Sequence, residues 1–255
     1  LHRCYRNSVP GSLAAARMVD YHRKKRTWQH KIDCFITLTG FARDKFIEAG
    51  FPSEKIIVKP NSCEVPKAKN KKVIKKEGAL FVGRLSQEKG IKTMLDAWRN
   101  LTVPLRVAGD GPFFDRHQSN KYCDIKFLGL IDSELVAEEM KRAVFLVMPS
   151  ECYEGFPIVL VEALSHGLPV IASRLGAMEE IIQDGVTGLH FEPGNAQDLR
   201  KKVQWMYNHP NECKQMGENA KKEYEKKFTP EKNYELLMTI YNSAIENHKK
   251  NINGQ

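Results

Sequence analysis

Two glutamates eight positions apart, Glu154 and Glu162, lie around the start of a predicted helix. The apolar run 143–148 that precedes them is typical of a strand. Pro157 suits the first turn of a helix, where a missing N–H costs little. We therefore expect Glu154 in the loop ahead of the helix and Glu162 about two turns inside it. The free N–H groups of the helix start would lie between the two carboxylates.

Such an arrangement is an anion site with a carboxylate on each side. A nucleoside diphosphate sugar has the matching layout, with two phosphates between two hydroxyl-bearing rings. The sequence alone leaves a second interpretation open, in which Glu154 caps the helix and Glu162, between Val161 and Ala163, is a surface residue.

A second group of candidates follows the predicted strand 79–82. Gly83 permits a tight turn, and the cations Arg84 and Lys89 lie five residues apart near a helix start. Together they could clamp a diphosphate. The segment lacks the GK[ST] of a P-loop and the GxGxxG of a dinucleotide site, so an ordinary solvated turn is the alternative.

Two further loops carry glycines at the ends of predicted strands. Gly109 and Asp110 follow one strand, and Gly129 and Leu130 follow the next. Glycines allow a backbone to approach a ligand closely, and free backbone groups near Gly129 could contact a base. Ordinary turns are again the alternative. The functional interpretation gains weight because all four loops follow strands of one predicted parallel sheet and would meet at the same edge.

The order of apolar runs and helical patterns predicts an α/β fold, a Rossmann-like parallel sheet with helices on both faces. The expected strands are 79–82, 105–108, 125–128, 144–148, 170–172 and 188–191, and the expected helices are 91–100, 133–142, 157–166, 177–183, 196–208, 211–227 and 230–247.

The first 60 residues form a separate part in this interpretation. We expect a helix over 12–31, a strand over 34–38, a helix over 42–49 and a strand over 56–58. Residues 61–77, rich in lysine and poor in apolar residues, are expected to form an exposed linker.

The net charge of +9 is concentrated in the N-terminal third. Residues 1–76 hold 18 of the 40 Lys and Arg but 6 of the 31 Asp and Glu, so this part carries +12 and the remainder −3. Nucleic acid, an anionic membrane and a phosphorylated acceptor are the partner classes that attract such charge. Without zinc-finger spacing or an RNA-binding signature, we expect no nucleic acid. The basic run 21–26 in a predicted helix favours peripheral contact with an anionic membrane through 1–76, with a solvated helix face as the alternative.

The remaining composition is that of an ordinary globular protein, with 42% hydrophobic and 28% charged residues. No apolar run approaches the ~20 residues of a membrane span, and the start has no signal-peptide pattern. The six scattered cysteines form no CxxC pair, which predicts reduced thiols, a cytoplasmic location and no zinc site.

Taken together, these motifs resemble glycosyltransferase family 4, retaining enzymes of the GT-B fold that use nucleotide sugars. The resemblance covers about residues 30–245 and rests on segments 82–90, 108–112, 127–129, 149–164, 167–172 and 176–188.

The resemblance implies roles for individual residues. Arg84 and Lys89 would contact the donor diphosphate, Glu154 the transferred sugar and Glu162 the ribose hydroxyls. Further contacts would come from backbone groups of Gly155, Phe156, Pro157, Ile158 and Val159 for the sugar and phosphates, and of Gly129 and Leu130 for the base. His2 matches a histidine that the family carries near its reaction centre.

A GT-B enzyme has two Rossmann-like domains facing across a cleft, whereas this sequence matches only the tail of the first. The implied organisation is a remnant of the acceptor-side domain (1–60), a linker (61–77), a donor-binding domain (78–228) and a helix crossing back (229–255). We expect residues 1–60 to expose apolar surface or to self-associate.

The implied activity is that of a hexosyltransferase in surface polysaccharide or glycolipid synthesis. A UDP- or GDP-linked sugar would be transferred with retention to a hydroxyl of a saccharide or lipid-linked acceptor, without cofactor or metal. The alternative is a truncated nucleotide-sugar-binding module, or one subunit of a split enzyme, that is inactive alone. The sequence does not specify the sugar, the base or the acceptor.

Overall fold

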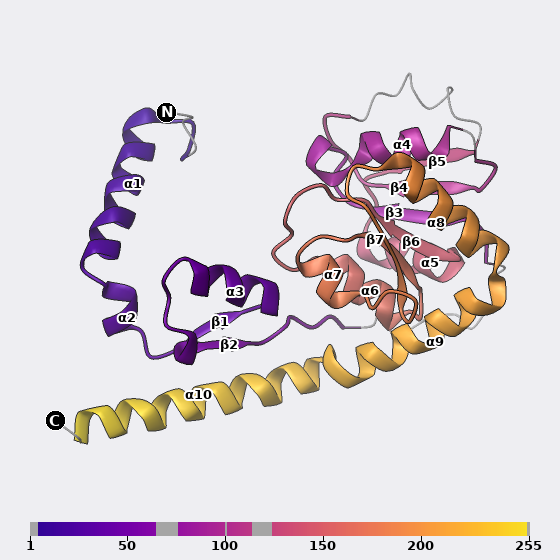
Figure 1. Ribbon diagram of the computed structural model, residues 1–255. Coiled ribbons are helices and arrows are strands. Elements are labelled where there is room, and N and C mark those ends of the chain that lie inside the picture. Colours follow the sequence, from indigo (N-terminus) through magenta and orange to yellow (C-terminus); the bar gives the residue numbers. More distant parts are fainter. Residues whose placement is uncertain (1–4, 65–75, 100, 114–123, 254–255) are drawn as a thin grey trace.

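The computed structural model describes residues 5–64, 76–99, 101–113 and 124–253. Its main feature is a six-stranded parallel sheet in the order β5-β4-β3-β6-β7-β8 (Figure 1). The strands are β3 (Ala79–Val82), β4 (Leu105–Ala108), β5 (Ile125–Gly129), β6 (Phe145–Met148), β7 (Val170–Ser173) and β8 (Gly188–Phe191). The expected α/β fold with a parallel sheet is thus confirmed, and every expected strand is present to within one or two residues.

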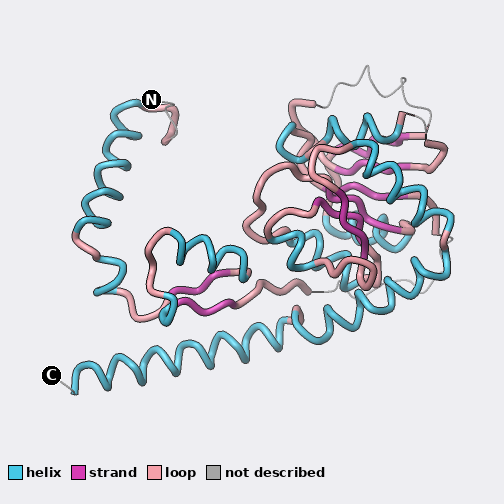
Figure 2. The backbone as a smooth tube through the Cα atoms, viewed as in Figure 1, coloured by secondary structure: helices cyan, strands magenta, loops and turns pink. Residues whose placement is uncertain are grey.

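Helices cover both faces of this sheet, as Figure 2 shows. They are α4 (Ile91–Trp98), α5 (Ser133–Arg142), α6 (Ile158–Ser165), α7 (Ala177–Ile181), α8 (Ala196–Asn208) and α9 (Pro210–Lys227). Successive residues of the central strands enter opposite cores, because side chains alternate along a strand. Phe81 lies in the core under α4 and α8, and its neighbour Leu80 lies in the core under α5, α6 and α7.

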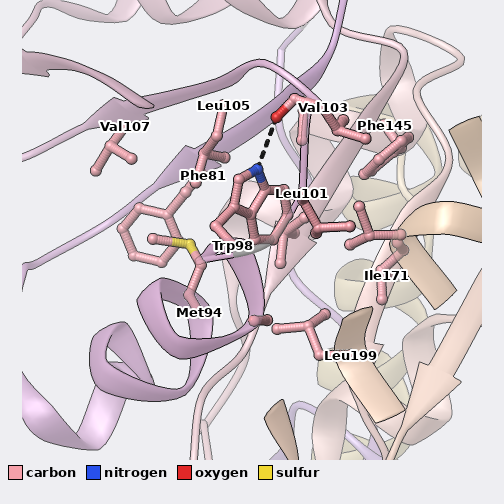
Figure 3. Packing of buried hydrophobic residues seen from close by; sticks show 14 of the residues in the cluster. Phe81, Met94, Trp98, Leu101, Val103, Leu105, Val107, Phe145, Ile171 and Leu199 are labelled. Carbon is pink, nitrogen blue, oxygen red and sulfur yellow. Dashed lines mark hydrogen bonds between the residues drawn. The ribbon is translucent and has the colours of Figure 1, made fainter. Parts of the chain in front are cut away.

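The core under α4 is drawn in Figure 3, where Trp98 packs among Phe81, Met94 and Leu199. The Trp98 indole N–H donates to the carbonyl oxygen of Val103 at 2.9 Å, so its one polar atom is satisfied inside the core. This packing holds α4 against the sheet and thereby places the loop that joins β3 to α4.

The N-terminal part is smaller and more open. It contains α1 (Val9–Lys24), α2 (Thr27–Lys31), β1 (Phe35–Thr37), α3 (Gly40–Glu48), the 3₁₀ turn η1 (Ser53–Lys55) and β2 (Ile56–Val58). β1 and β2 form a two-stranded parallel sheet joined through α3. Large apolar side chains are exposed here, among them Met18, Val19, Ile36 and Phe46.

One helical prediction in this part is wrong. The continuous helix expected over 12–31 is broken between α1 and α2, because Arg26 adopts a left-handed conformation with φ 48°. The sequence has no glycine, proline or asparagine at this break, so the residue types there do not predict it.

The last helix, α10 (Pro230–Asn253), runs from beneath the large sheet to beneath the N-terminal part (Figure 1). The Nζ of Lys59, just after β2, donates to the side-chain oxygen of Asn233 at 2.9 Å, and His248 lies 3.2 Å from Asp33. The long C-terminal helix therefore connects the two parts of the molecule.

Candidate functional site

The loop after β3 brings two cations to the carboxyl edge of the sheet. Gly83 and Arg84 follow the strand directly, and Lys89 ends the 3₁₀ turn η2 (Gln87–Lys89) just before α4. The loop is fixed by its neighbours, since the backbone N–H of Gly83 donates to the Ala108 oxygen at 3.0 Å. The Arg84 side chain is exposed, and that of Lys89 is 26% exposed.

Lys89 forms an ion pair with Glu154, with Nζ 2.6 Å from Oε1. The Ser150 hydroxyl donates to the same carboxylate oxygen at 2.7 Å. Glu154 is 13% exposed and Ser150 is buried, so both donors act where water screens them little. The carboxylate of Glu154 is consequently held in one orientation.

These side chains line a pocket of about 250 Å³. Its wall also includes residues of β3, the end of β6 and the start of α6, in full Phe81, Val82, Gly83, Arg84, Lys89, Met148, Ser150, Glu154, Pro157 and Val159. The guanidinium-bearing Arg84 and the beginning of the helix that carries Glu162 therefore face one cavity. Two cations, one carboxylate and a helix start surround a space of small-molecule size.

A second pocket of about 270 Å³ adjoins the first and shares Val82, Gly83 and Arg84 with it. Its other lining residues are Ala108, Gly109, Asp110, Leu130, Ile131 and Val136. Apart from Arg84 and Asp110 the lining is apolar or glycine, which suits a flat ring better than a second anion. The two pockets form a charged compartment beside an apolar one.

Gly109 makes the junction between these compartments possible. Its φ is 137°, and a Cβ atom built on it would lie 1.9 Å from the carbonyl oxygen of Gly83. Its N–H donates to the Gly129 oxygen at 2.8 Å, which ties the third loop to the second. Gly129 also has a positive φ, 70°, but space around its Cβ position is open.

The helix after Glu154 begins later than expected. Pro157 is its N-cap and Ile158 its first residue, so Pro157 is not inside the first turn. Leu160 donates to the Pro157 oxygen, which leaves the N–H groups of Ile158 and Val159 at the free helix start. Glu162 is the fifth helical residue, just over one turn inside α6 and not two.

Glu162 is half-buried, and burial raises the pKa of its carboxyl. Within the part of the chain that the structure describes, it is not among the lining residues of either pocket. It does approach the segment after β2, because its charge contributes to raising the pKa of the Cys63 thiol to about 11, behind the larger effect of burial. It is thus not the fully exposed surface residue of the second interpretation.

The other candidates are placed as follows. Gly155 and Ile158 are exposed at the mouth of the α6 start, and Phe156 turns inward, its ring centroid 6.2 Å from that of Phe228. Leu130 is 83% exposed at the rim of the apolar pocket. His2 lies outside the described residues.

Sequence reasoning missed the role of Ser150. It is the second residue after β6, and a hydroxyl directly at a strand end beside a loop carboxylate was the available signal. A cavity of about 820 Å³, larger than the two pockets above, is lined mainly by α9 residues together with Val144 and Pro169. Those two residues precede β6 and β7, so this cavity lies at the opposite edge of the sheet from the candidate site.

The fold and the paired pockets define a class of protein, the α/β proteins with pockets beyond the carboxyl ends of a parallel sheet, where ligands bind in such folds. Residues 64–223, more than half of the chain, match the family described as glycosyl transferases group 1, and the chain belongs to that family.

Individual relatives agree with this assignment. An uncharacterized glycosyltransferase of Methanocaldococcus jannaschii, MJ1178, is 36% identical over 171 residues, which are 64% of this chain and 48% of the relative. The O-antigen chain mannosyltransferase C of Escherichia coli is 27% identical over 175 residues, 66% of this chain and 47% of the relative. The chain thus spans about half the length of these curated relatives.

Among solved structures, Anabaena HepE in complex with UDP superimposes with a TM-score of 0.72 at 21% identity, covering 82% of this chain and 64% of that one. This likeness shows that the fold is that of GT-B glycosyltransferases. In the described residues, the helices are too short or too polar to cross a lipid bilayer.

Proposed function

We propose that this chain supplies the donor site of a glycosyltransferase that uses a nucleoside diphosphate sugar and retains the anomeric configuration. The observation that carries the proposal is the pair of adjoining pockets, one with Arg84, Lys89, Glu154 and a helix start, the other mainly apolar. The diphosphate would lie between the two cations, the sugar against Glu154 and the base in the apolar pocket. The UDP bound by HepE supports a UDP-linked donor, and GDP remains the alternative.

The charges are placed for the reaction that this donor undergoes. When the bond between the anomeric carbon and the diphosphate oxygen breaks, negative charge grows on the diphosphate. Arg84, Lys89 and the N–H groups at the start of α6 would stabilise that charge. The acceptor hydroxyl forms the new bond to the anomeric carbon, and its proton passes to the departing diphosphate. Nothing in this sequence of events requires a separate base.

Lys89 would serve both the diphosphate and Glu154. Its Nζ lies 2.6 Å from Oε1 of Glu154, and it lines the same pocket as Arg84, where its ammonium would face the diphosphate. The Ser150 hydroxyl donates to the same carboxylate, so Glu154 would be oriented toward the sugar. We propose that Glu162 accepts hydrogen bonds from the ribose hydroxyls, and that no metal takes part.

The proposal extends to the domains and partners of the whole protein. Residues 1–60 would be the tail of an acceptor-side domain, 61–77 a linker, 78–228 the donor domain and 229–255 the returning helix. A saccharide or lipid-linked acceptor in polysaccharide or O-antigen synthesis is supported by the Escherichia coli relative, an O-antigen chain mannosyltransferase. A cytoplasmic location is part of the same proposal.

A second candidate function is that of a donor-binding module, or of one subunit of a split enzyme, that is inactive alone. It is favoured because every lining residue of the two pockets lies between Phe81 and Val159, so nucleotide binding there needs no residue of the N-terminal part. Transfer assays on the isolated chain and on the full-length protein separate the two. Turnover by the full-length protein with none by the chain supports a half-site, and turnover by the chain alone contradicts it.

The catalytic proposal is tested by sugar transfer in the full-length enzyme. Arg84→Ala should reduce turnover by ~10²-fold or more, because one fixed cation at the developing charge is lost. Lys201→Ala, which removes an exposed cation on α8, is the matched control and should leave turnover unchanged. Normal turnover in Arg84→Ala contradicts the assignment.

A further inference from the structure

The N-terminal part contacts helix α7, which follows β7 on the side of the large sheet that carries the candidate site. The backbone N–H groups of Gly40 and Phe41, the first two residues of α3, donate to Glu180 on α7. The distances are 2.8 Å to Oε1 and 2.9 Å to Oε2, so both carboxylate oxygens are used. The next N–H, that of Ala42, donates to the cap residue Thr39 at 3.1 Å.

This contact is more than the capping of a helix by its own loop. A helix start leaves N–H groups unpaired, and a carboxylate there gains from both hydrogen bonding and the helix dipole. Here Thr39 supplies the local cap, and the remaining two donors are satisfied by a residue about 140 positions away in the sequence. The carboxylate therefore fixes the place of α3 relative to α7.

An aromatic contact lies beside this carboxylate. The ring of Phe41 packs against Tyr153 with centroids 4.8 Å apart. Gly176, just before α7, leaves the room for it, because a Cβ there would lie 3.1 Å from both rings. Residues from α3, from the loop after β6, from the loop after β7 and from α7 thus form one cluster, which we call the α3 contact (Gly40, Phe41, Tyr153, Gly176 and Glu180).

The α3 contact ends one residue from the candidate site. Tyr153 is covalently joined to Glu154, whose carboxylate is held by Lys89 and Ser150. Tyr153 is 63% exposed, and the Phe41 ring covers part of its surface. A displacement of α3 would be transmitted to the backbone that carries Glu154.

We propose that Glu180 and Phe41 are positioning residues for sugar transfer. Glu180 anchors the start of α3, and Phe41 then presses on Tyr153 so that Glu154 keeps its orientation toward the transferred sugar. This inference rests on the function proposed above. It predicts that the α3 contact controls the rate of transfer and leaves unaffected the binding of the nucleotide, which the proposed function assigns to Arg84 and the apolar pocket.

The test uses the full-length enzyme with Glu180→Ala, Glu180→Gln and Phe41→Leu. Glu179→Ala is the matched control, because it removes an exposed carboxylate from the adjacent position of the same helix. Transfer kinetics give kcat and the donor KM, calorimetry gives UDP and GDP affinity, and hydrogen exchange reports on the amides of Gly40 and Phe41.

We expect Glu180→Ala to lower kcat about tenfold with the donor KM changed by less than about twofold, because misplacement of a catalytic group costs rate and not ground-state binding. The kcat of Glu180→Gln should lie between those of wild type and Glu180→Ala, since a carboxamide has one acceptor oxygen where the carboxylate has two. The amides of Gly40 and Phe41 should exchange faster in Glu180→Ala than in wild type. In Glu179→Ala they should exchange at the wild-type rate. Phe41→Leu should lower kcat while leaving those amides protected.

Two results would overturn the inference. If Glu180→Ala shows faster amide exchange at Gly40 and Phe41 but a wild-type kcat, Glu180 only caps α3 and does not position Glu154. An equal loss in kcat for Glu179→Ala would show a general charge effect. If the wild-type enzyme binds neither UDP nor GDP, the proposed function itself fails, and that result is recognised before any variant is compared.

Discussion

Lys89 and Glu154 come from loops after two neighbouring strands, β3 and β6, and their charged groups lie 2.6 Å apart at the shared edge. They are 65 positions apart in the sequence. The parallel sheet brings them together, because β3 and β6 are adjacent and their carboxyl ends point the same way. The ion pair therefore depends on the pairing of β3 with β6, which places the two loops side by side.

Lys89→Ala should reduce both stability and turnover. The pair is partly exposed, so we expect a loss of about 1–2 kcal/mol, less than the 3–5 kcal/mol of a fully buried pair. Turnover in the full-length enzyme should fall by ~10²-fold. Urea denaturation and transfer assays measure the two effects, and Lys92→Ala, an exposed lysine on α4, serves as control. A variant with unchanged stability and turnover would contradict the role of the pair.

Much of this arrangement follows from sequence pattern. Buried strands bounded by glycines, such as 79–82 before Gly83, are read from short apolar runs, and α5 and α8 were predicted with their observed bounds. The placement of four loops at one edge follows from the alternation of strands and helices.

Other features depend on contacts between distant residues. Glu180 could not be matched to the start of α3, nor Ser150 to Glu154, because hydrogen bonds between side chains follow from packing and not from local pattern. The break at Arg26 and the late start of α6 at Ile158 are decided by local geometry that residue type constrains weakly.

Glu162→Gln should raise stability while weakening nucleotide binding. Burial raises the pKa of this carboxyl, so its ionised form opposes folding. The contribution of the Glu162 carboxyl to folding stability is fully present below its unfolded-state pKa and is lost as pH rises through its folded-state pKa. The Gln side chain cannot ionise, so the variant does not lose this stability at neutral pH. Its melting temperature at neutral pH should therefore be higher than that of wild type. Without the charged acceptor for the ribose hydroxyls, affinity for UDP or GDP should fall about tenfold or more.

The same substitution has a signature in pH. In wild type, nucleotide affinity should weaken as pH is lowered from neutral toward the raised pKa of Glu162, because binding requires the ionised carboxylate. In Glu162→Gln this part of the pH dependence should disappear. Calorimetry at several pH values measures it, and parallel pH profiles for the two proteins would exclude Glu162 from the ribose site.

Gly109→Ala and Gly129→Ala form a matched pair. Both positions have positive φ, which costs an L-residue roughly 1–2 kcal/mol. At Gly109 the new Cβ would also lie 1.9 Å from the Gly83 oxygen, whereas at Gly129 the space is open. Gly109→Ala should therefore be the more destabilising and should abolish nucleotide binding. Equal losses of unfolding free energy in the two variants would contradict the close approach of the loops.

The N-terminal charge predicts binding to anionic membranes. Tyr21 and Met18 are exposed on α1, beside basic residues that include Arg23 and Lys24. Flotation with vesicles containing phosphatidylglycerol should show binding at low salt that weakens at high salt. Replacing Arg23, Lys24 and Lys25 with glutamine should remove it. If the protein does not float with the vesicles at low salt, the membrane contact is rejected, whereas the proposal of a donor site is not affected.

The central claim is that one edge of the large sheet binds a nucleoside diphosphate through the two adjoining pockets. Calorimetric titration of the chain with UDP and with GDP tests it most directly, with Arg84→Ala and the control Lys201→Ala measured alongside. We predict saturable binding of one of the two nucleotides, weakened about tenfold or more in Arg84→Ala because a charge-assisted phosphate contact is lost, and unchanged in Lys201→Ala. Binding of neither nucleotide, or equal affinity in wild type and Arg84→Ala, would contradict it.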